Sequence, residues 1–258
     1  MSTEAVRKNY SPVGASLIEK LYSDDYLSIG GTQSTDILAD QAGITAESRV
    51  LDVGSGLGGP ALHLAATRGC RITGLDLVET SILEANNRAK ARGLEGLATF
   101  QAGDATDMPF ESGTFDVVWG QDAWCHVPDK PKLIAECARV LAPKGTIVFT
   151  DWLQTGEMDE AQREAVHDAT ASSNMATMEC YCELLEKSGF SVLGREDISA
   201  AFITQYRTII ARLERLESEI SEQFNPKVFR IMMEKNGAIL HAFEGGLIGG
   251  GRLVAKRG

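Results

Sequence analysis

The chain has 258 residues, 43% of them hydrophobic, and a formal net charge of −11. This content can fill one sizeable core, so we expect a single domain over residues 1–258. The excess of 36 acidic over 25 basic residues excludes a nucleic-acid partner, because phosphate binding needs clustered positive charge. No run of about 18 uncharged apolar residues occurs, and no basic-flanked apolar run opens the chain, which excludes a membrane span and an export signal. We therefore expect a cytoplasmic protein.

Short apolar runs alternate with amphipathic stretches from Arg49 to Asp151, a pattern typical of a parallel sheet covered by helices. Strands are predicted at Arg49–Val53, Arg71–Leu75, Ala98–Gln101, Phe115–Trp119 and Thr146–Thr150. The helices predicted between them are Pro60–Thr67, Glu79–Arg92 and Lys130–Leu141. Ligands of such sheets collect at the carboxyl ends of the strands, so the residues that follow each strand are candidates for a site.

Beyond Asp151 the alternation gives way to longer amphipathic stretches. The predicted elements are helices at Asp159–Thr170 and Thr177–Ser188, a strand near Ser191–Arg195, a long helix Ala201–Gln223 and a closing strand Leu247–Lys256. Apolar residues of the long helix recur at helical spacing, which favours a core-facing helix over a partner-binding stripe. No repeat or Pro-rich linker separates this part, so we expect a lid built into the same domain.

The most informative segment is a glycine turn after the first predicted strand. Gly54, Gly56 and Gly58 follow the buried run Val50–Val53, and Asp76 ends the next strand. Glycines at these positions let the backbone turn sharply and approach a ligand closely. A carboxylate at Asp76 is placed to accept hydrogen bonds from ribose hydroxyls. The order of strand, glycine turn, helix, strand and acid therefore predicts a nucleoside-binding site.

Asp104 follows the third strand and is expected to face the same ligand. Its carboxylate is predicted to accept from an adenine amino group, while the Ala105 amide donates to a ring nitrogen. Leu77 and Gln121, which follow the second and fourth strands, complete this set. The alternative for Asp104 is a turn acid that caps the next segment, and the alternative for the glycines is a tight turn that binds nothing.

The spacing Gly54-x-Gly56-x-Gly58 differs from the dinucleotide fingerprint and resembles that of class I methyltransferases. This resemblance implies S-adenosylmethionine as the cofactor. It also implies a Rossmann-like α/β fold, with a mostly parallel seven-stranded sheet, helices on both faces and a helical lid. We accordingly divide the domain into an N-terminal helical lid (1–45), a cofactor-binding core (46–151), a helical substrate cap with the remaining core (152–246) and a closing strand (247–258).

From about Val50 onward, the chain resembles the sarcosine and dimethylglycine N-methyltransferases of betaine synthesis. The likeness rests on the glycine-rich closing strand and on Gln121-Asp122-Ala123-x-x-His126-x-Pro128-Asp129-Lys130, Glu136-Cys137-Ala138-Arg139-Val140-Leu141 and His167-Asp168. Its methyltransferase motifs are specific, whereas its substrate motifs are less so. The resemblance implies a small amine as the methyl acceptor.

The amino-terminal segment is instead similar to the phosphoethanolamine methyltransferases, in Tyr10 and in Tyr26-Leu27-Ser28-Ile29-Gly30-Gly31. This likeness implies that Tyr10, Ser28 and Gly30 close over the cofactor. Asp122 and His126 match the site pair of that family as well. The segment is therefore expected to act as a lid on the cofactor.

Two positions of the expected acceptor site depart from the phosphoethanolamine enzymes, since Trp152 and His167 stand where they have tyrosines. The segment 152–182 also offers only Arg163 to hold a phosphate, which weakens a phosphobase acceptor. Trp124 and Trp152 are candidates for an aromatic wall that receives a methylated ammonium by cation–π contact, and both are equally expected as core. His167 is a further candidate for the substrate site.

Methyl transfer to an amine needs alignment, exclusion of water and an unprotonated nitrogen. His126 is the candidate for orienting the amine or accepting its proton, with Asp122 as its partner. The alternative is a histidine that only hydrogen-bonds the backbone of the lid. Methyltransferases can work by proximity alone, so this alternative stays open.

The sequence predicts no metal site, because no His and acid spacing resembles one and the five cysteines lack paired spacing. Three arginines of the long helix are expected on a solvated face, with carboxylate binding by one of them as the alternative: Arg207, Arg212 and Arg215. We predict a methyltransferase of a small-molecule amine, with sarcosine or dimethylglycine as the leading acceptor. The alternatives are a phosphoethanolamine-type N-methyltransferase, a C- or O-methyltransferase of a larger apolar metabolite, and a cofactor-binding module without turnover. The sequence does not determine the oligomeric state.

Overall fold

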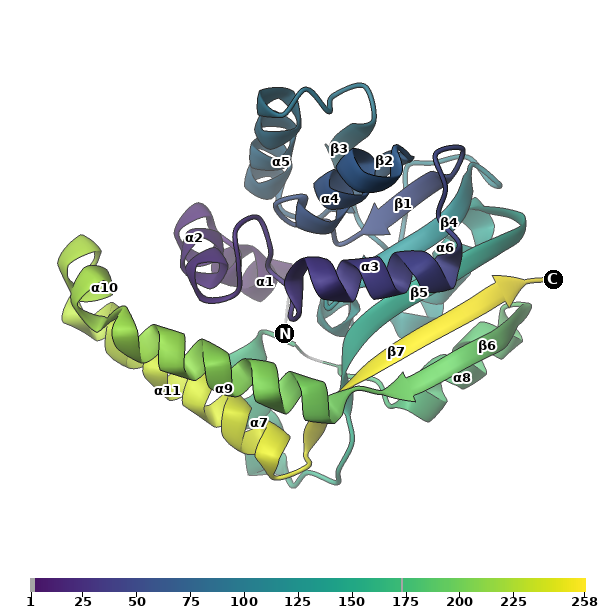
Figure 1. Cartoon of the computed structure of the whole chain (residues 1–258). Helices are drawn as coiled ribbons and strands as arrows, with labels where there is room; N and C mark the ends of the chain where they lie inside the picture. The colour runs from purple at the N-terminus through teal and green to yellow at the C-terminus, as the bar shows by residue number, and fades with distance from the viewer. Residues whose placement is uncertain (1–2, 173) are drawn as a thin grey trace.

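The computed structural model describes residues 3–172 and 174–258, so the first two residues of the predicted lid lie outside the described residues. Its centre is a seven-stranded sheet in the order β3-β2-β1-β4-β5-β7-β6 (Figure 1). Strand β7 is antiparallel to both of its neighbours, whereas the other pairs are parallel, which confirms the predicted mostly parallel sheet. The strands are β1 (Arg49–Val53), β2 (Arg71–Asp76), β3 (Ala98–Ala102), β4 (Phe115–Gln121), β5 (Leu141–Gln154), β6 (Phe190–Asp197) and β7 (Ile248–Arg257).

Strands β4 and β5, whose ends bear on the site, run further than predicted. Strand β4 reaches Gln121 and β5 reaches Gln154, whereas the prediction ended them two and four residues earlier. Strand β5 continues because it stays paired with the antiparallel β7 up to Gln154, which lies opposite Ile248. Trp152 is therefore a strand residue.

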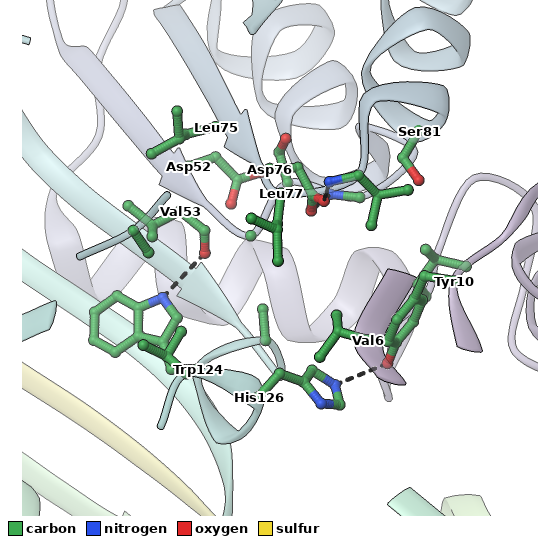
Figure 2. Close-up of a pocket in the computed structure, with 18 of the residues that line it drawn as sticks. Val6, Tyr10, Asp52, Val53, Leu75, Asp76, Leu77, Ser81, Trp124 and His126 are labelled. Carbon is green, nitrogen blue, oxygen red and sulfur yellow. Dashed lines mark hydrogen bonds between the residues drawn. The ribbon is translucent and has the colours of Figure 1, made fainter. Parts of the chain in front are cut away.

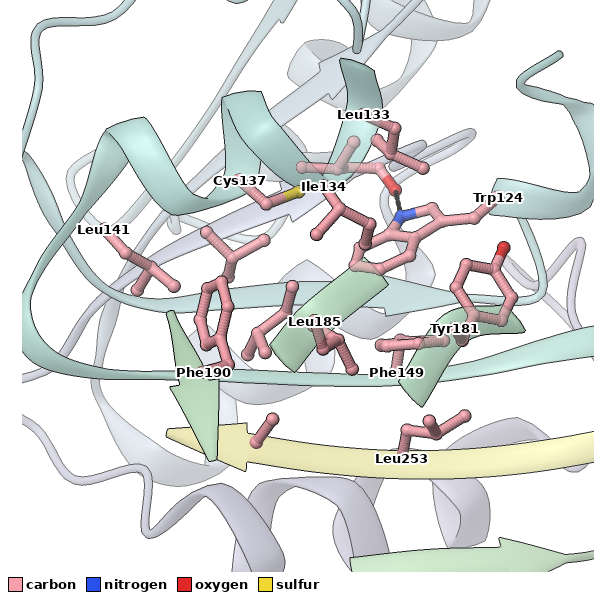
Figure 3. Close-up of a cluster of buried hydrophobic side chains, with 14 of the residues drawn as sticks. Trp124, Leu133, Ile134, Cys137, Leu141, Phe149, Tyr181, Leu185, Phe190 and Leu253 are labelled. Carbon is pink, nitrogen blue, oxygen red and sulfur yellow. Dashed lines mark hydrogen bonds between the residues drawn. The ribbon is translucent and has the colours of Figure 1, made fainter. Parts of the chain in front are cut away.

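Helices cover both faces of the sheet (Figure 1). They are α3 (Gly31–Ala42), α4 (Gly59–Arg68) and α5 (Glu79–Ala91) on one face, and α6 (Lys130–Val140) and α8 (Met178–Lys187) on the other. The first three bury a cluster that includes Leu38, Leu62 and Ala85. The other two pack around Phe149 and Tyr181, whose rings meet edge to face with centroids 4.9 Å apart (Figure 3). Helices therefore pack against both faces of the sheet. This packing fixes the position of the sheet edge at which β1, β2 and β4 end.

Capping side chains mark where the later helices begin. The Asp129 carboxylate accepts the Lys132 N–H at 2.9 Å at the start of α6. A reciprocal capping box of Asp159 and Gln162 opens α7 (Glu160–Thr170). Each such cap satisfies a backbone donor that has no partner within the helix and stabilises the helix by about 1 kcal/mol.

Between β6 and β7 the chain forms three helices where one was predicted. These are α9 (Ser199–Arg215), α10 (Glu217–Gln223) and α11 (Pro226–Glu244). The predicted single helix Ala201–Gln223 is wrong at Leu216, where the chain turns and Ile220 becomes fully buried. Helix α11 packs along α9 and was not predicted, although the Asn225 side chain caps it by accepting the Val228 N–H at 3.0 Å and a proline follows (Figure 1). The missed signal was this Asn-Pro pair.

The N-terminal segment folds as α1 (Thr3–Asn9) and α2 (Pro12–Leu21) ahead of α3. Helix α2 contacts both α5 of the sheet layer and α9 of the cap (Figure 1). Leu17 and Leu21 of α2 belong to the same buried cluster as Trp152 and Phe243. The N-terminal segment therefore packs both against the helix layer beside the sheet and against the cap helices. Within the described residues, we find no helix with the length and apolar character needed to cross a membrane.

Candidate active site

A cavity of about 270 Å³ lies where β1, β2 and β4 end. Its walls come from the loops after these strands, from the segment after β3 and from the N-terminal segment (Figure 2). This is the edge at which open α/β sheets bind ligands. The predicted site residues that line it are Tyr10, Ser28, Gly54, Gly56, Asp76, Leu77, Asp104, Ala105, Gln121, Asp122, Trp124 and His126.

The glycine turn needs glycine at its first position for two reasons. The φ angle of Gly54 is +85°, which L residues rarely adopt, and a Cβ there would lie 2.4 Å from the Cβ of Ala123. Gly56 also has a positive φ of 51°, and its Cβ would lie 3.1 Å from Leu27. The turn thus packs directly under the loop after β4 and under the N-terminal segment, which brings backbone to the cavity wall.

Asp76 holds this turn and still faces the cavity. One carboxylate oxygen accepts the Gly56 N–H at 2.8 Å, and the other accepts the Val78 N–H at 2.8 Å. Burial raises the pKa of Asp76, and the backbone donors oppose that rise. A carboxylate has about four lone-pair positions, so two remain to accept from a ligand. Asp52 lies beside Asp76 in the cavity wall (Figure 2).

Buried polar atoms without partners gather around the cavity. Among the described residues, the side chains with such an atom include Ser28 (Oγ), Asp52 (Oδ2), Ser55 (Oγ) and Gln121 (Nε2), and all four line the cavity. Leaving such an atom unsatisfied costs about 1–3 kcal/mol, so the cavity is built for a polar ligand. These donors and acceptors fit a ligand with ribose hydroxyls and amino and carboxylate groups, as S-adenosylmethionine has.

Sequence reasoning missed two of these four residues, Asp52 and Ser55. Burial and the neighbouring Asp76 raise the pKa of Asp52 to about 8. An acid in the middle of the apolar run Val50–Val53 was itself a signal, because carboxylates are rarely fully buried without a role. Ser55 stood between the predicted glycines and carried no comparable signal.

The acid after β3 shows both of its predicted features. Asp104 lines the cavity with Ala105, yet it is exposed, and its Oδ1 accepts the Thr106 N–H at 2.7 Å. This hydrogen bond to the Thr106 N–H is the contact expected from the alternative that Asp104 caps a turn. Its exposure leaves the carboxylate free to contact a ligand as well.

His126 is joined to the N-terminal segment by a hydrogen bond. Its Nε2 lies 2.9 Å from the Tyr10 hydroxyl, and its Nδ1 lies 3.2 Å from the carbonyl of Ala171 (Figure 2). A carbonyl only accepts, so Nδ1 carries the proton and Nε2 accepts from the tyrosine. Burial lowers the pKa of His126 to about 4, so the imidazole is neutral at physiological pH. The prediction that Asp122 is its partner is wrong, because Tyr10 and Ala171 occupy both ring nitrogens.

Asp122 has its own partners. One carboxylate oxygen accepts the Ile29 N–H at 2.7 Å and the other accepts the Thr150 hydroxyl at 2.7 Å. Its backbone takes a positive φ of 55°, an unusual conformation for a residue with a side chain. Burial is the main cause that raises its pKa to about 7, with the neighbouring Asp151 adding to the rise. The group can therefore change its charge close to neutral pH.

A second cavity of about 600 Å³ lies between the N-terminal helices and the cap. It is lined by side chains of α1 and α2 on one side and of α7, α9 and α11 on the other. Five residues line both cavities and so form a shared wall: Tyr10, Leu27, Asp122, His126 and Ala171. The two cavities therefore adjoin at the Tyr10–His126 hydrogen bond and the Asp122 carboxylate.

The two predicted tryptophans differ in their surroundings. Trp124 is 1% exposed, stacks on Phe149 with centroids 4.3 Å apart and donates from Nε1 to the Val53 carbonyl at 3.0 Å (Figures 2 and 3). Its ring belongs to the core, so the core alternative describes it best. Trp152 lines the second cavity and meets Tyr206 edge to face at 5.9 Å.

Two predicted site residues lie outside both cavities. Gly30 is the N-cap of α3, with a φ of 88°, and a Cβ there would press on Ser34 at 2.9 Å. His167 lies on α7, where its neighbours Asp168 and Ala169 line the second cavity but it does not. The cofactor contact of Gly30 and the substrate contact of His167 therefore stay predictions.

Two of the predicted arginines of the cap have partners within the protein. Arg207 pairs with Glu244 at 2.6 Å, and Arg212 donates to the carbonyl of Tyr22 at 3.2 Å. No arginine is among the residues that line either cavity in the described chain. Nor do the described residues include three or more His, Cys, Asp or Glu side chains grouped as metal ligands.

Comparison with known proteins agrees with this geometry. Residues 51–149 match the family model described as methyltransferase domain. A sarcosine/dimethylglycine N-methyltransferase from Halorhodospira halochloris is 30% identical over 222 residues, which cover 84% of this chain and 78% of that protein. The chain belongs to the S-adenosylmethionine-dependent methyltransferases. Its cofactor is S-adenosylmethionine, which the unpartnered polar atoms of the first cavity fit.

Other members of the family are similar to a comparable degree. A sterol 24-C-methyltransferase from Eremothecium gossypii is 32% identical over 191 residues, 71% of this chain and 51% of that protein. The chain spans only 33% of the length of the first curated relative it matches. The solved phosphoethanolamine N-methyltransferase 2 of Haemonchus contortus superimposes with a TM-score of 0.89 at 22% identity, over 97% of this chain and 58% of that one, which shows a shared fold. The family is thus established, and the acceptor is a separate question.

Proposed function

We propose that this methyltransferase transfers its methyl group to the nitrogen of a small-molecule amine. The observation that carries the proposal is Asp122, a buried carboxylate in the wall shared by the two cavities. An ammonium in the second cavity would find there a negative charge next to the cofactor site. Bound S-adenosylmethionine supplies an electrophilic methyl group on a sulfonium. The protein must supply the alignment and the unprotonated nitrogen.

Asp122 is better suited than His126 to take the proton from the amine. With a pKa of about 7, its carboxylate can accept a proton near physiological pH, whereas the pKa of His126 is about 4. The lone pair of His126 Nε2 is also occupied by the Tyr10 hydroxyl. We assign His126 and Tyr10 to orienting the amine at the shared wall. Of the two roles that the sequence predicted for His126, orientation stays with it and proton acceptance passes to Asp122.

The first cavity supports the predicted cofactor contacts. Asp76 faces this cavity and can accept from ribose hydroxyls, and we propose that Asp104 and Ala105, which also line it, contact the adenine ring. We propose contacts to the amino and carboxylate groups of the cofactor for the remaining predicted residues of this wall: Ser28, Gly54, Gly56, Leu77 and Gln121.

A phosphobase acceptor is less favoured by the second cavity. Its cationic lining residues in the described chain are Lys8 and Lys235, and Lys235 already lies 3.3 Å from the Asp168 carboxylate. A phosphate dianion is best held by bidentate arginine, which this cavity does not offer. Sarcosine and dimethylglycine stay the acceptors that the sequence predicts, and the cytoplasmic location likewise stays a prediction.

A second candidate is C- or O-methylation of a larger apolar metabolite. The observation in its favour is the apolar lining of the second cavity, which includes Leu17, Trp152 and Met232. For this candidate, Asp122 would accept a proton from carbon or oxygen in place of nitrogen.

Calorimetry with S-adenosylhomocysteine, followed by mass spectrometry of candidate acceptors, tests the proposal. The panel contains glycine, sarcosine, dimethylglycine, phosphoethanolamine and longer amines, with alcohols and phenols of matched size. We expect S-adenosylhomocysteine to bind and a methyl gain to occur on an amine. A gain on hydroxyl or ring acceptors with none on any amine would overturn N-methylation in favour of the second candidate.

A further inference from the structure

The second cavity is much larger than a free amino acid requires. Its volume is about 600 Å³, more than twice the 270 Å³ of the first cavity. Sarcosine has only six non-hydrogen atoms, so it would leave most of the second cavity to water. The volume lies in the range of pockets that enclose drug-sized ligands.

The lining changes character along the cavity. At the wall shared with the cofactor site it is polar, with Asp122, His126 and the hydroxyl of Tyr10. Toward α2 and α11 it becomes apolar, with residues such as Leu17 and Met232. A ligand that fits both ends carries a polar reacting group on an apolar body.

The apolar lining reaches the surface of the molecule. Among the described residues, four large hydrophobic side chains are exposed: Val13 at 52%, Leu83 at 64%, Leu193 at 64% and Ile231 at 42%. Two of them, Val13 on α2 and Ile231 on α11, line the second cavity. Exposed apolar groups that adjoin a cavity indicate the place where an apolar ligand enters or extends.

A carboxylate on the acceptor would find lysines and no arginine in the same cavity, in the part of the chain that the structure describes. Lys235 is engaged by the side chain and backbone carbonyl of Asp168, which leaves Lys8 as the other cationic lining residue. Amino-acid recognition by a bidentate arginine is therefore not built into this wall.

We infer that the second cavity binds the apolar body of the methyl acceptor, so that the substrate is an amphipathic amine with an alkyl or ring portion of about ten or more carbons. The inference rests on the proposed N-methylation for the amine and on the cavity itself for the apolar body. The amine lies at Asp122, and the apolar body extends between α2 and α11 toward Val13 and Ile231.

Two homologous series of probes test the inference with the full chain. The first is N,N-dimethylalkylamines from ethyl to decyl, assayed for methyl transfer with S-adenosylmethionine beside sarcosine and dimethylglycine. The second is n-alkanols of the same lengths, measured by calorimetry on the protein loaded with S-adenosylhomocysteine. We expect kcat/KM for the amines and affinity for the alcohols to rise roughly fourfold per methylene, the factor that equals ~0.8 kcal/mol.

Variants at the mouth of the cavity sharpen the test. Ile231→Ser should lower kcat/KM for the decyl amine by about fivefold and leave the ethyl amine unchanged, because only a long chain reaches the mouth. Leu193→Ser is the matched control, since Leu193 is exposed on β6 and lines neither cavity. It should change neither value.

The outcomes separate this inference from the proposed function. A flat response to chain length in both series would overturn the apolar site, and turnover of dimethylglycine in that case would leave N-methylation standing. Alcohols that bind more tightly with length, without methyl transfer to any amine, would keep the apolar site and overturn N-methylation. A length response that Ile231→Ser and Leu193→Ser reduce equally would place the apolar body elsewhere and overturn the assignment.

Discussion

The two cavities of this methyltransferase are built in different ways. Most residues that line the first cavity, called the cofactor cavity from here on, belong to a single stretch of chain from Asp52 to Asp129. Each strand end in this stretch contributes a short loop. The second cavity is assembled from α1, α2, α7, α9 and α11, which are far apart in the sequence. The first is therefore set by local motifs on a rigid sheet, and the second by how helices pack.

This difference predicts different responses to substitution. Substitutions in the cofactor cavity should distort backbone geometry or remove hydrogen bonds, and they should therefore lower cofactor affinity strongly. Changes in the shared wall and the second cavity should mainly affect catalysis and acceptor selectivity. Asp122, Tyr10 and His126 line both cavities. Substitutions of these residues can therefore test whether effects on cofactor affinity and effects on catalysis are separate.

The largest effect is expected from Gly54→Ala. The new Cβ would lie 2.4 Å from the Cβ of Ala123, and the turn would have to shift. We expect affinity for S-adenosylhomocysteine to fall at least ~100-fold by calorimetry, because overpacking and a positive φ together cost about 3 kcal/mol.

Gly113→Ala is the matched control for this substitution. Gly113 has a similar φ of 72°, but no atom lies within 4 Å of its added Cβ. It should cost about 1 kcal/mol of stability and leave cofactor affinity unchanged. Equal affinity in the two variants would mean that close packing of the glycine turn does not shape the site.

Asp76→Ala is expected to weaken S-adenosylhomocysteine binding by roughly 30-fold to 100-fold, since it removes charged acceptors worth about 1.5–3 kcal/mol each. The Gly56 N–H would also lose its partner. Asp104→Ala should weaken binding less, because Asp104 is exposed and its contacts compete with water. Titration calorimetry on both variants measures the order, and the reverse order would contradict our assignment of Asp76 to the ribose.

Asp122→Asn tests the shared wall through pH. Burial raises the pKa of Asp122 to about 7, so its carboxylate form, which attracts an ammonium and accepts its proton, is present above that pH. We expect kcat/KM for an amine to rise with pH through about 7 in the wild type and to lose that rise in the variant. At pH 8 the variant should be about 20-fold slower, the effect of losing one charged hydrogen bond of ~1.8 kcal/mol.

The amide can keep both structural contacts of Asp122. Its oxygen can accept the Ile29 N–H, and its nitrogen can donate to the Thr150 hydroxyl. Affinity for S-adenosylhomocysteine should therefore stay within threefold of the wild type. An unchanged pH profile with normal cofactor binding would remove Asp122 from the reaction.

The smallest effect is expected from Tyr10→Phe, which removes the hydrogen bond to His126. Its loss should lower kcat by about 3-fold to 10-fold, the range of ~0.5–1.5 kcal/mol per neutral hydrogen bond. Tyr26→Phe is the control, since the buried Tyr26 hydroxyl bonds Thr35 at 3.2 Å and lines neither cavity. If both variants lower kcat equally, the effect is one of lid stability and the Tyr10–His126 contact has no separate role.

The cofactor side could be predicted well from the sequence because its signals are local. Glycines at 54 and 56 and the acid at 76 lie at strand ends, and parallel strands bring their carboxyl ends to one edge. The exceptions follow the same logic. A serine such as Ser55 is not a residue type that by itself indicates a site. Asp52 lies within an apolar run, and sequence reasoning passed over it although burial raises its pKa.

The acceptor side was predicted less well because helix packing decides it. His167 and Gly30 were assigned by likeness, yet neither is among the residues that line the two cavities. The Asp122–His126 pair was inferred from closeness in the chain, but the 3-10 turn Trp124–His126 sends the imidazole to Tyr10 instead. Helix α11, which supplies much of the second cavity, was missed altogether.

The sequence by itself therefore determined the class of fold, the cofactor and many of the residues that line the first cavity, since strand periodicity and glycine conformation are properties of short segments. Only the tertiary structure decided the size and lining of the second cavity, the core role of Trp124 and the charge state of the groups in the shared wall. Those properties depend on burial among residues that are distant in the chain, and a local sequence pattern does not predict such burial.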